Sequence, residues 1–212
     1  MRPRFLDRRD AGRALAAELL PAYGGAPGVV VLALPRGGVP VGYEVARALG
    51  APLDVFVVRK LGVPGREELA MGAIAGGNVR VLNVDVVRAL GIPRDVIDRV
   101  TADEQRELER RERAYRGQRP PPELRGRTVI LVDDGLATGS TMRAAVLALR
   151  EHAPASVVVA VPVGAPEACA ALRSLADDCL CVRTPERFQG VGLWYENFAQ
   201  TSDEEVGELL KG

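Results

Sequence analysis

Aliphatic runs of strand length alternate with longer stretches of helical periodicity along most of this chain. The strand-like runs cover residues 29–34, 55–58, 128–132, 157–161 and 179–182. The helix-like stretches cover residues 39–49, 141–151 and 167–176, after an amphipathic stretch near 10–20. Because parallel strands need a crossover that is usually helical, this order predicts an α/β fold with a mostly parallel sheet flanked by helices.

Two segments interrupt the alternation. Repeated glycines and short β-prone pieces between Met71 and Asn83 predict a hairpin or irregular strands. Residues 94–116 are dominated by charge and carry a thin apolar stripe, which predicts a long helix that the prolines at 120–122 stop. A charged helix of this kind is usually solvated and held by Glu–Arg pairs, although an arm that packs on a partner subunit fits the same pattern.

Composition narrows the class of protein. A length of 212 residues fits a single domain, and 47% hydrophobic with 26% charged residues supports a compact core rather than disorder. The 28 basic residues balance the 28 acidic ones, so no global field favours a nucleic acid or a membrane surface. No apolar segment approaches the roughly 20 residues that cross a bilayer, and we expect a cytoplasmic protein.

The cysteines do not form a recognisable metal or disulfide framework. Cys169, Cys179 and Cys181 are odd in number and lack the CxxC spacing, and His152 is the single histidine. A zinc site needs about four such ligands, so none is expected. We therefore expect three reduced, mostly buried thiols.

One stretch carries an unusual concentration of polar chemistry, VILVDDGLATGST at residues 129–141. Its aliphatic residues predict a strand buried on both faces, so Asp133 and Asp134 lie at the carboxyl end, where open α/β sheets bind ligands. Adjacent carboxylates are good partners for paired ribose hydroxyls. The small residues of 135–141 precede a helix start, which is a favourable place for a phosphate. A helix cap would explain one such residue but not this density.

The stretch resembles the phosphoribosyl pyrophosphate (PRPP) binding motif of type I phosphoribosyltransferases, which has four hydrophobic residues, two acids, a short spacer and Thr-Gly-x-Thr. The resemblance implies that Asp133 and Asp134 hold the ribose. It also implies that the spacer and cradle bind the 5′-phosphate, through Ala137, Thr138, Gly139, Ser140 and Thr141. The family's fold is a parallel sheet flanked by helices with a small hood, in agreement with the predicted alternation.

Two further segments match the family in order along the chain. Arg36, Gly37 and Gly38 follow the first strand and resemble the pyrophosphate loop, which in the family carries a non-proline cis peptide, here at Pro35–Arg36. Arg59 and Lys60 end the second strand and would supply cations to the pyrophosphate. Taken alone, the first segment is also a plausible turn and the second a pair of surface charges.

The resemblance also implies a mechanism. Pyrophosphate leaves the ribose through an oxocarbenium-like transition state, which Asp133 and Asp134 would stabilise on the sugar side. Arg36, Lys60, backbone amides and Mg²⁺ would stabilise the departing group, with Asp133 as the direct or water-bridged Mg²⁺ ligand. The segment 61–70, which has no core-forming pattern, would be a mobile loop that closes over the reacting centre.

The acceptor is less well defined. The aromatic C-terminal stretch resembles the hood of hypoxanthine-type enzymes, so Phe188, Trp194 and Glu196 are candidate acceptor-binding residues, although an aromatic plug closing the core fits as well. The acid that serves as the base for 6-oxopurines in that family is replaced by Ala137. The lysine that contacts the exocyclic oxygen is replaced at Gly164-Ala165. These departures argue against a 6-oxopurine.

The whole chain is most similar to a bacterial group of predicted phosphoribosyltransferases without an assigned acceptor. We expect one domain over 1–212, with a core at about 24–182, a charged helical insertion at about 93–118 and a hood at about 183–212 to which the N-terminus contributes. The resemblance implies PRPP, Mg²⁺ and a nucleobase-like acceptor as partners, and a homodimer. Two alternatives remain. One is a PRPP- or nucleotide-sensing regulator without turnover, and the other is an amidophosphoribosyl or pyrophosphate-cleaving activity without a base acceptor.

Overall fold

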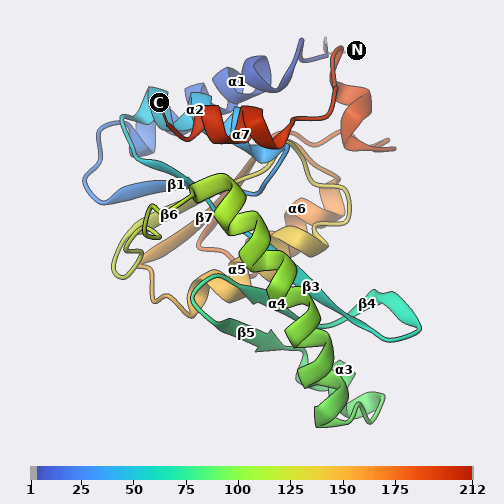
Figure 1. Ribbon diagram of the computed structural model, residues 1–212. Coiled ribbons are helices and arrows are strands. Elements are labelled where there is room, and N and C mark those ends of the chain that lie inside the picture. The colour runs from blue at the N-terminus through green and yellow to red at the C-terminus, as the bar shows by residue number, and fades with distance from the viewer. Residues whose placement is uncertain (1–3, 212) are drawn as a thin grey trace.

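The centre of the protein is a five-stranded parallel sheet, seen in a computed structural model that describes residues 4–211 (Figure 1). The strand order is β2-β1-β6-β7-β8, and each neighbouring pair is parallel. The strands are β1 (Val29–Ala33), β2 (Leu53–Val55), β6 (Thr128–Val132), β7 (Ser156–Val163) and β8 (Asp178–Arg183). The predicted α/β class with a mostly parallel sheet is confirmed.

Helices cover both faces of this sheet. On one face α1 (Arg8–Tyr23) and α2 (Gly38–Leu49) pack against alternate residues of β1 and β6, such as Val31 and Ile130. On the other face α5 (Ser140–Arg150) and α6 (Pro166–Arg173) pack against the intervening residues, such as Val30 and Val129. Because both faces are covered, the strands contain uninterrupted aliphatic runs rather than alternating polar residues.

A second, antiparallel sheet follows β2. It consists of β3 (Val58–Val63), β4 (Arg66–Ala75) and β5 (Val79–Leu82) in that order, so the hairpin predicted between residues 71 and 83 is confirmed. The prediction of a mobile loop at 61–70 is wrong, because most of these residues belong to β3 and β4. Leu61 and Val63 are buried in one apolar cluster with Met71. The segment alternates inward and outward residues over only a few positions, which is too short to read as a strand from sequence.

The charged helix forms where it was expected. After the short α3 (Val84–Ala89), α4 (Arg94–Arg116) buries Ile97, Leu108 and Tyr115 and leaves most of its other residues in contact with water. Figure 1 shows it as a long helix that runs from the antiparallel sheet back toward the parallel one. It ends at Gly117, which has a φ of +62°, rather than at the prolines predicted to stop it.

A short segment before α1 pairs with the C-terminal region. Phe5 forms a parallel bridge with Tyr195, just after the 3₁₀ turn η1 (Val191–Trp194), and the backbone N–H of Glu196 donates to the carbonyl of Phe5. The last helix, α7 (Asp203–Leu209), packs against α2 and α4. Phe5 and Leu6 therefore pair with the segment that follows η1.

The cysteines depart from expectation. Cys169 of α6 and Cys181 of β8 are joined by a disulfide, so the expectation of three reduced thiols is wrong for this pair. The two residues are only 12 positions apart, and the α6 crossover places them against each other, which an odd count without a motif does not predict. Cys179 remains a buried thiol, and burial raises its pKa. Among residues 4–211 no helix has the length and hydrophobicity of a membrane span.

Replacement of Leu108 by alanine tests the packing of α4. Leu108 is fully buried, so the variant should lose about 2–4 kcal/mol of unfolding free energy, measured by urea denaturation. Leu20→Ala is the matched control, because Leu20 is 49% exposed on α1 and should change stability by less than about 0.5 kcal/mol. Equal effects of the two substitutions would show that α4 is not anchored through Leu108.

Candidate functional site

The residues of the PRPP-like motif and those of the pyrophosphate-like loop meet at one edge of the parallel sheet. β1 and β6 are adjacent and in register, with Ala33 opposite Val132, so the segments that follow them leave the sheet side by side. The backbone N–H of Leu34 then donates to the carbonyl of Val132 at 2.9 Å. The cis peptide expected at Pro35–Arg36 is present in this loop.

The two glycines of the loop lie directly against the two acids. A Cβ on Gly37 would overlap the carboxylate oxygen Oδ2 of Asp134. A Cβ on Gly38 would lie 2.8 Å from the carbonyl oxygen of Val132 and 3.0 Å from the Cα of Asp133. Neither glycine is required by a positive φ, so the need for glycine here is steric.

Asp133 and Asp134 are partly buried and close to each other. Burial, followed by the charge of Asp134, raises the pKa of Asp133 well above its usual value. The backbone N–H of Asp134 donates to Oδ1 of Asp133 at 2.8 Å, which partly compensates the charge. Burial also raises the pKa of Asp134, and the Arg8 guanidinium opposes that effect. The pair is thus held in an environment that is costly for two negative charges.

Arg8 is a site residue that sequence reasoning missed. Its Nε donates to Oδ2 of Asp134 at 2.8 Å, its Nη1 donates to the carbonyl of Ala199 at 2.6 Å, and its guanidinium lies 4.0 Å above the ring of Phe198. The side chain is only 10% exposed. In the sequence it is one of several arginines near the start of α1, and nothing in the pattern distinguishes it from its neighbours.

The predicted phosphate cradle is open at the start of α5. Gly139 occupies the N-cap position with a φ of +71° and has no side chain to cap the helix. Thr138 Oγ1 accepts from the N–H of Ser140 at 3.3 Å, and the cradle as a whole has small residues at its surface. A helix start lined by small residues is suited to bind an anion through its backbone N–H groups.

The C-terminal segment is attached to the acid pair by Tyr195. Its hydroxyl donates to the backbone carbonyl of Asp134 at 2.6 Å, and its ring is 3% exposed. Phe188 and Trp194, two of the predicted acceptor-binding residues, pack into the same small apolar cluster, whereas Glu196 is exposed. Tyr195 was missed, although it lies in the aromatic C-terminal stretch between the candidates Trp194 and Glu196.

Within residues 4–211 the three predicted cations form ion pairs with acids other than Asp133 and Asp134. The guanidinium of Arg59 points to Glu104 of α4 at 2.6 Å, and Nζ of Lys60 donates to the carbonyl of Glu68 at 3.4 Å. Nη1 of Arg36 lies 3.6 Å from Oδ1 of Asp203 on α7. Within the described residues, each predicted cation therefore has an acidic residue or a carbonyl as its neighbour.

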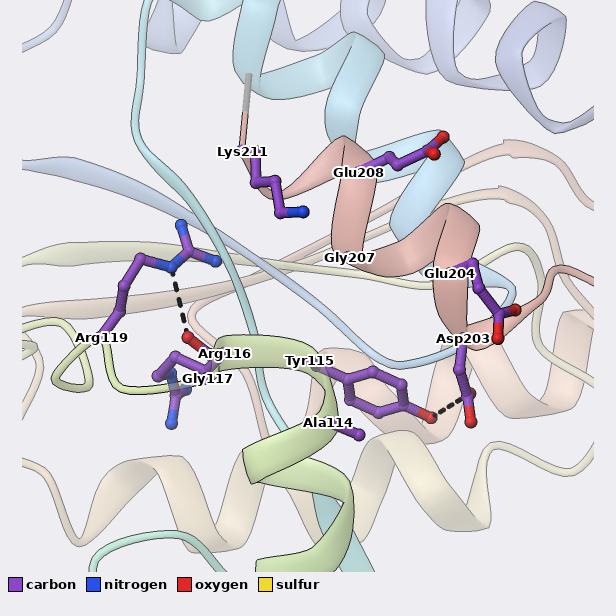
Figure 2. Close-up of a pocket in the computed structure, with 10 residues that line it drawn as sticks. All are labelled: Ala114, Tyr115, Arg116, Gly117, Arg119, Asp203, Glu204, Gly207, Glu208 and Lys211. Atoms are coloured by element: carbon purple, nitrogen blue, oxygen red, sulfur yellow. Dashed lines mark hydrogen bonds between the residues drawn. The ribbon is translucent and has the colours of Figure 1, made fainter.

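A separate cavity of about 680 Å³ lies between the end of α4 and α7 (Figure 2). Its lining includes Tyr115, Arg119, Asp203 and Lys211, and Tyr115 donates its hydroxyl proton to Asp203 across one wall. None of the motif acids or cradle residues lines it. Asp203 of its lining is the ion-pair neighbour of Arg36.

Asp133→Asn should stabilise the ligand-free protein at neutral pH. Burial and the charge of Asp134 raise the folded pKa of Asp133, so an aspartate at this position destabilises the fold at pH 7, and the neutral amide should increase the unfolding free energy. As the pH falls through the folded pKa, wild-type Asp133 becomes protonated and the difference should shrink. Chemical denaturation between pH 7 and 4 measures it. Asp177→Asn should have the opposite sign at pH 7, because Arg150 lowers the pKa of Asp177.

Tyr195→Phe tests the attachment of the C-terminal segment. The substitution keeps the ring but removes the donor to the carbonyl of Asp134, so the unfolding free energy should fall by about 1–2 kcal/mol. Tyr43→Phe is the control, since the Tyr43 hydroxyl makes no hydrogen bond within residues 4–211 and its loss should have little effect. Thermal unfolding of the two variants compares them directly, and an unchanged midpoint for Tyr195→Phe would contradict this role.

Comparison with known proteins identifies the family to which the chain belongs. The phosphoribosyl transferase domain family matches residues 6–196. Two Mycobacterium tuberculosis proteins, from strains CDC 1551 and H37Rv, are provisionally named phosphoribosyl transferases and are 51% identical to this chain over 206 residues. The alignment covers 97% of this chain and 46% of each of theirs, so the chain spans about half of the length of these relatives.

Solved structures show the same fold. The crystal structure of TT1426 from Thermus thermophilus is 43% identical, covers 98% of this chain and 97% of its own, and superposes with a TM-score of 0.90. AQ2163 from Aquifex aeolicus is 16% identical over 96% of this chain and 84% of its own, with a TM-score of 0.53, and it supports the fold alone. From its matched domain and the identity to its relatives, this chain belongs to the phosphoribosyl transferase family.

Proposed function

We propose that this protein transfers the 5-phosphoribosyl group from PRPP to a nitrogenous, nucleobase-like acceptor and releases pyrophosphate. The observation that carries the proposal is the contact between Gly37 and Gly38 and the acid pair, with the open helix start of α5 following in the same segment. A diphosphate loop, a ribose clamp and a phosphate cradle are thereby contiguous. That arrangement matches the order of the three parts in PRPP itself.

Each part of the site has a distinct task in this reaction. Asp133 and Asp134 would accept hydrogen bonds from the ribose hydroxyls and stabilise the positive charge that develops on the sugar. The N–H groups of residues 138–141 would hold the 5′-phosphate. Arg36, together with the loop amides, would stabilise the negative charge on the leaving pyrophosphate. Lys60 and Arg59 would join them only after leaving their present neighbours, Glu68 and Glu104.

The residues present fit a magnesium-dependent reaction. Mg²⁺ prefers oxygen ligands and usually keeps several waters when it bridges phosphates, so one or two carboxylates suffice. Asp133 fits best, because its charge is costly where it stands and Arg8 is bonded to Asp134 rather than to Asp133. We propose Asp133 as the ligand, direct or through water. When bound, the ion would offset charge on the departing pyrophosphate.

The site chemistry argues against a 6-oxopurine as the acceptor. Ala137 is exposed at the spacer position and offers no carboxylate to take a ring proton. At Gly164 a Cβ would lie 2.5 Å from the sulfur of Cys169. A larger residue at this position therefore cannot extend a side chain into the site. We propose Phe188, Trp194 and Glu196 as acceptor-binding residues, and a cytoplasmic homodimer by analogy with the family.

Calorimetry with PRPP and Mg²⁺ tests the donor. Wild type should bind, and the double variant Asp133→Asn with Asp134→Asn should not, because the ribose loses both charged acceptors. Asp103→Asn is the control, since Asp103 is an exposed acid on α4 that pairs with Arg106. Absence of binding by wild type would contradict the proposal.

A screen for pyrophosphate release then tests turnover. Purines, pyrimidines and their analogues are offered with PRPP, and at least one should release pyrophosphate at a rate that the double variant does not reach. Tight PRPP binding without release for any acceptor would instead favour the PRPP-sensing alternative. Release without any acceptor, with ribose 5-phosphate as product by mass spectrometry, would favour the hydrolytic one.

A further inference from the structure

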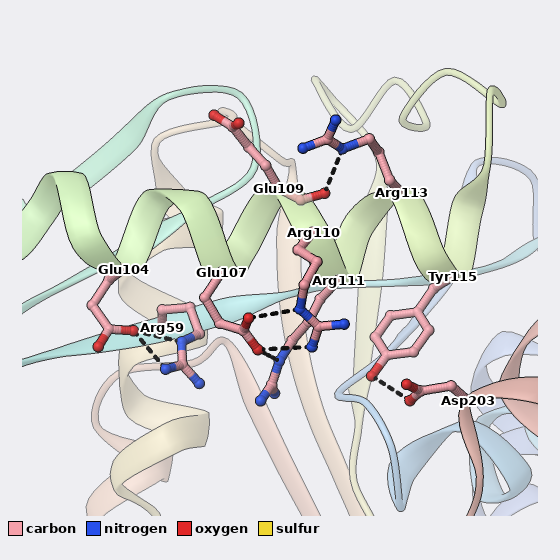
Figure 3. A network of polar contacts seen from close by, with 9 residues as sticks. All are labelled: Arg59, Glu104, Glu107, Glu109, Arg110, Arg111, Arg113, Tyr115 and Asp203. Carbon is pink, nitrogen blue, oxygen red and sulfur yellow. Dashed lines mark hydrogen bonds and ion pairs between the residues drawn. The ribbon is translucent and has the colours of Figure 1, made fainter.

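Two of the arginines proposed to bind pyrophosphate form ion pairs that involve α4. Arg59 pairs with Glu104 of α4, and Arg36 pairs with Asp203, which accepts a hydrogen bond from α4. Figure 3 shows Arg59 of β3 reaching Glu104 of α4 through two of its nitrogens. Both Nε and Nη2 lie 2.6 Å from Oε2 of Glu104, and the two side chains are 29% and 28% exposed. The pair joins elements that are 45 residues apart in the sequence. Arg59 is therefore oriented by α4.

Arg36 is paired with Asp203, which in turn contacts α4. Oδ1 of Asp203 lies 3.6 Å from Nη1 of Arg36 and accepts the hydroxyl proton of Tyr115 at 3.0 Å. Burial, and then the hydrogen bond to Asp203, raises the pKa of Tyr115, so this phenol remains a donor at neutral pH. Tyr115, in the last turn of α4, thus holds the carboxylate of Asp203 by a hydrogen bond (Figure 3). The same carboxylate oxygen is the ion-pair neighbour of Arg36.

The same face of α4 carries two more arginines between these pairs. Glu107 accepts from Arg110 and from Arg111 at 2.7 Å, which lowers the pKa of Glu107 to about 2. Arg110 also feels the charge of Asp203. The sequence predicted that a charged helix of this kind is most often solvated on its polar face. The Glu107–Arg110 pair agrees with that prediction, because Arg110 is 59% exposed. The side of α4 that carries Glu104 and Tyr115 also contacts β3 and α7.

Pyrophosphate and the carboxylates of Glu104 and Asp203 would compete for the same two arginines. An ion pair that is a quarter to a half exposed contributes at most about 1 kcal/mol, so it adds little to folding. A pyrophosphate group carries several negative charges and forms charge-assisted, bidentate hydrogen bonds with arginine, which a single carboxylate does not match. Pyrophosphate can therefore displace the carboxylates from these ion pairs. Until it does so, the same ion pairs orient the arginines.

We propose that Glu104 and Asp203 are positioning residues that keep Arg59 and Arg36 in ion pairs. A pyrophosphate group would then displace both carboxylates and bind both arginines. The inference rests on the proposed function, because it assumes that these arginines bind the donor. Glu104 has the larger effect of the two, since its contact to Arg59 is 2.6 Å whereas that of Asp203 to Arg36 is 3.6 Å. The helix insertion would thus set the affinity of the donor site.

Calorimetric titration of the full chain with inorganic pyrophosphate and Mg²⁺ tests this competition. Glu104→Gln removes the competing charge while keeping the length of the side chain, and it should tighten pyrophosphate binding about two- to fivefold. Asp203→Asn should tighten it less. Asp103→Asn is the matched control, since it removes one negative charge from the neighbouring position on α4 but its partner is the exposed Arg106, and its Kd should equal that of wild type.

A double-mutant cycle separates competition from a general change in charge. Arg59→Gln should weaken pyrophosphate binding, and Glu104→Gln should then have no further effect in the Arg59→Gln background. Unchanged or weaker binding by Glu104→Gln alone, relative to Asp103→Asn, would overturn the inference while leaving the proposed function intact. No binding by wild type would overturn both.

Discussion

The parallel register between β1 and β6 is the constraint on which the site depends. It places Ala33 opposite Val132, so the two segments that leave the sheet there are held within one hydrogen bond of each other. The approach is so close that only glycines fit at positions 37 and 38. A shift of one residue in this register would turn every side chain of β6 to the opposite face and separate the loop from the acids.

Placing two carboxylates at this edge has a cost that the rest of the structure offsets. Arg8 bonds to Asp134 and to the carbonyl of Ala199, and Tyr195 bonds to the carbonyl of Asp134. The first helix and the C-terminal segment are therefore attached to each other through Asp134 and directly through the bond from Arg8 to Ala199. Asp133 has no such side-chain partner among the described residues, and its side chain accepts from the backbone N–H of Asp134.

The regular elements of the core were predictable from residue pattern. Val129–Val132 and the glycine-rich segment after it specify a buried strand, a tight turn and a helix start, and each depends only on neighbouring residues. The strand at Leu61 and Val63, the disulfide between Cys169 and Cys181 and the end of α4 at Gly117 were not predicted. The first is too short to show a period. The disulfide depends on the α6 crossover placing its two residues together, and the prolines were a stronger stop signal than a single glycine.

What the sequence by itself determined is the order of the local motifs, because a strand, a turn and a helix start are each specified within a short run of neighbouring residues. The acids, the two-glycine loop and the cradle are in this class. Only the tertiary structure decided which distant charges meet them. Arg8 is 126 residues from Asp134 and Arg59 is 45 residues from Glu104. A single arginine in a sequence rich in arginine carries no mark of its partner, because charge acts through space and the fold sets the distances.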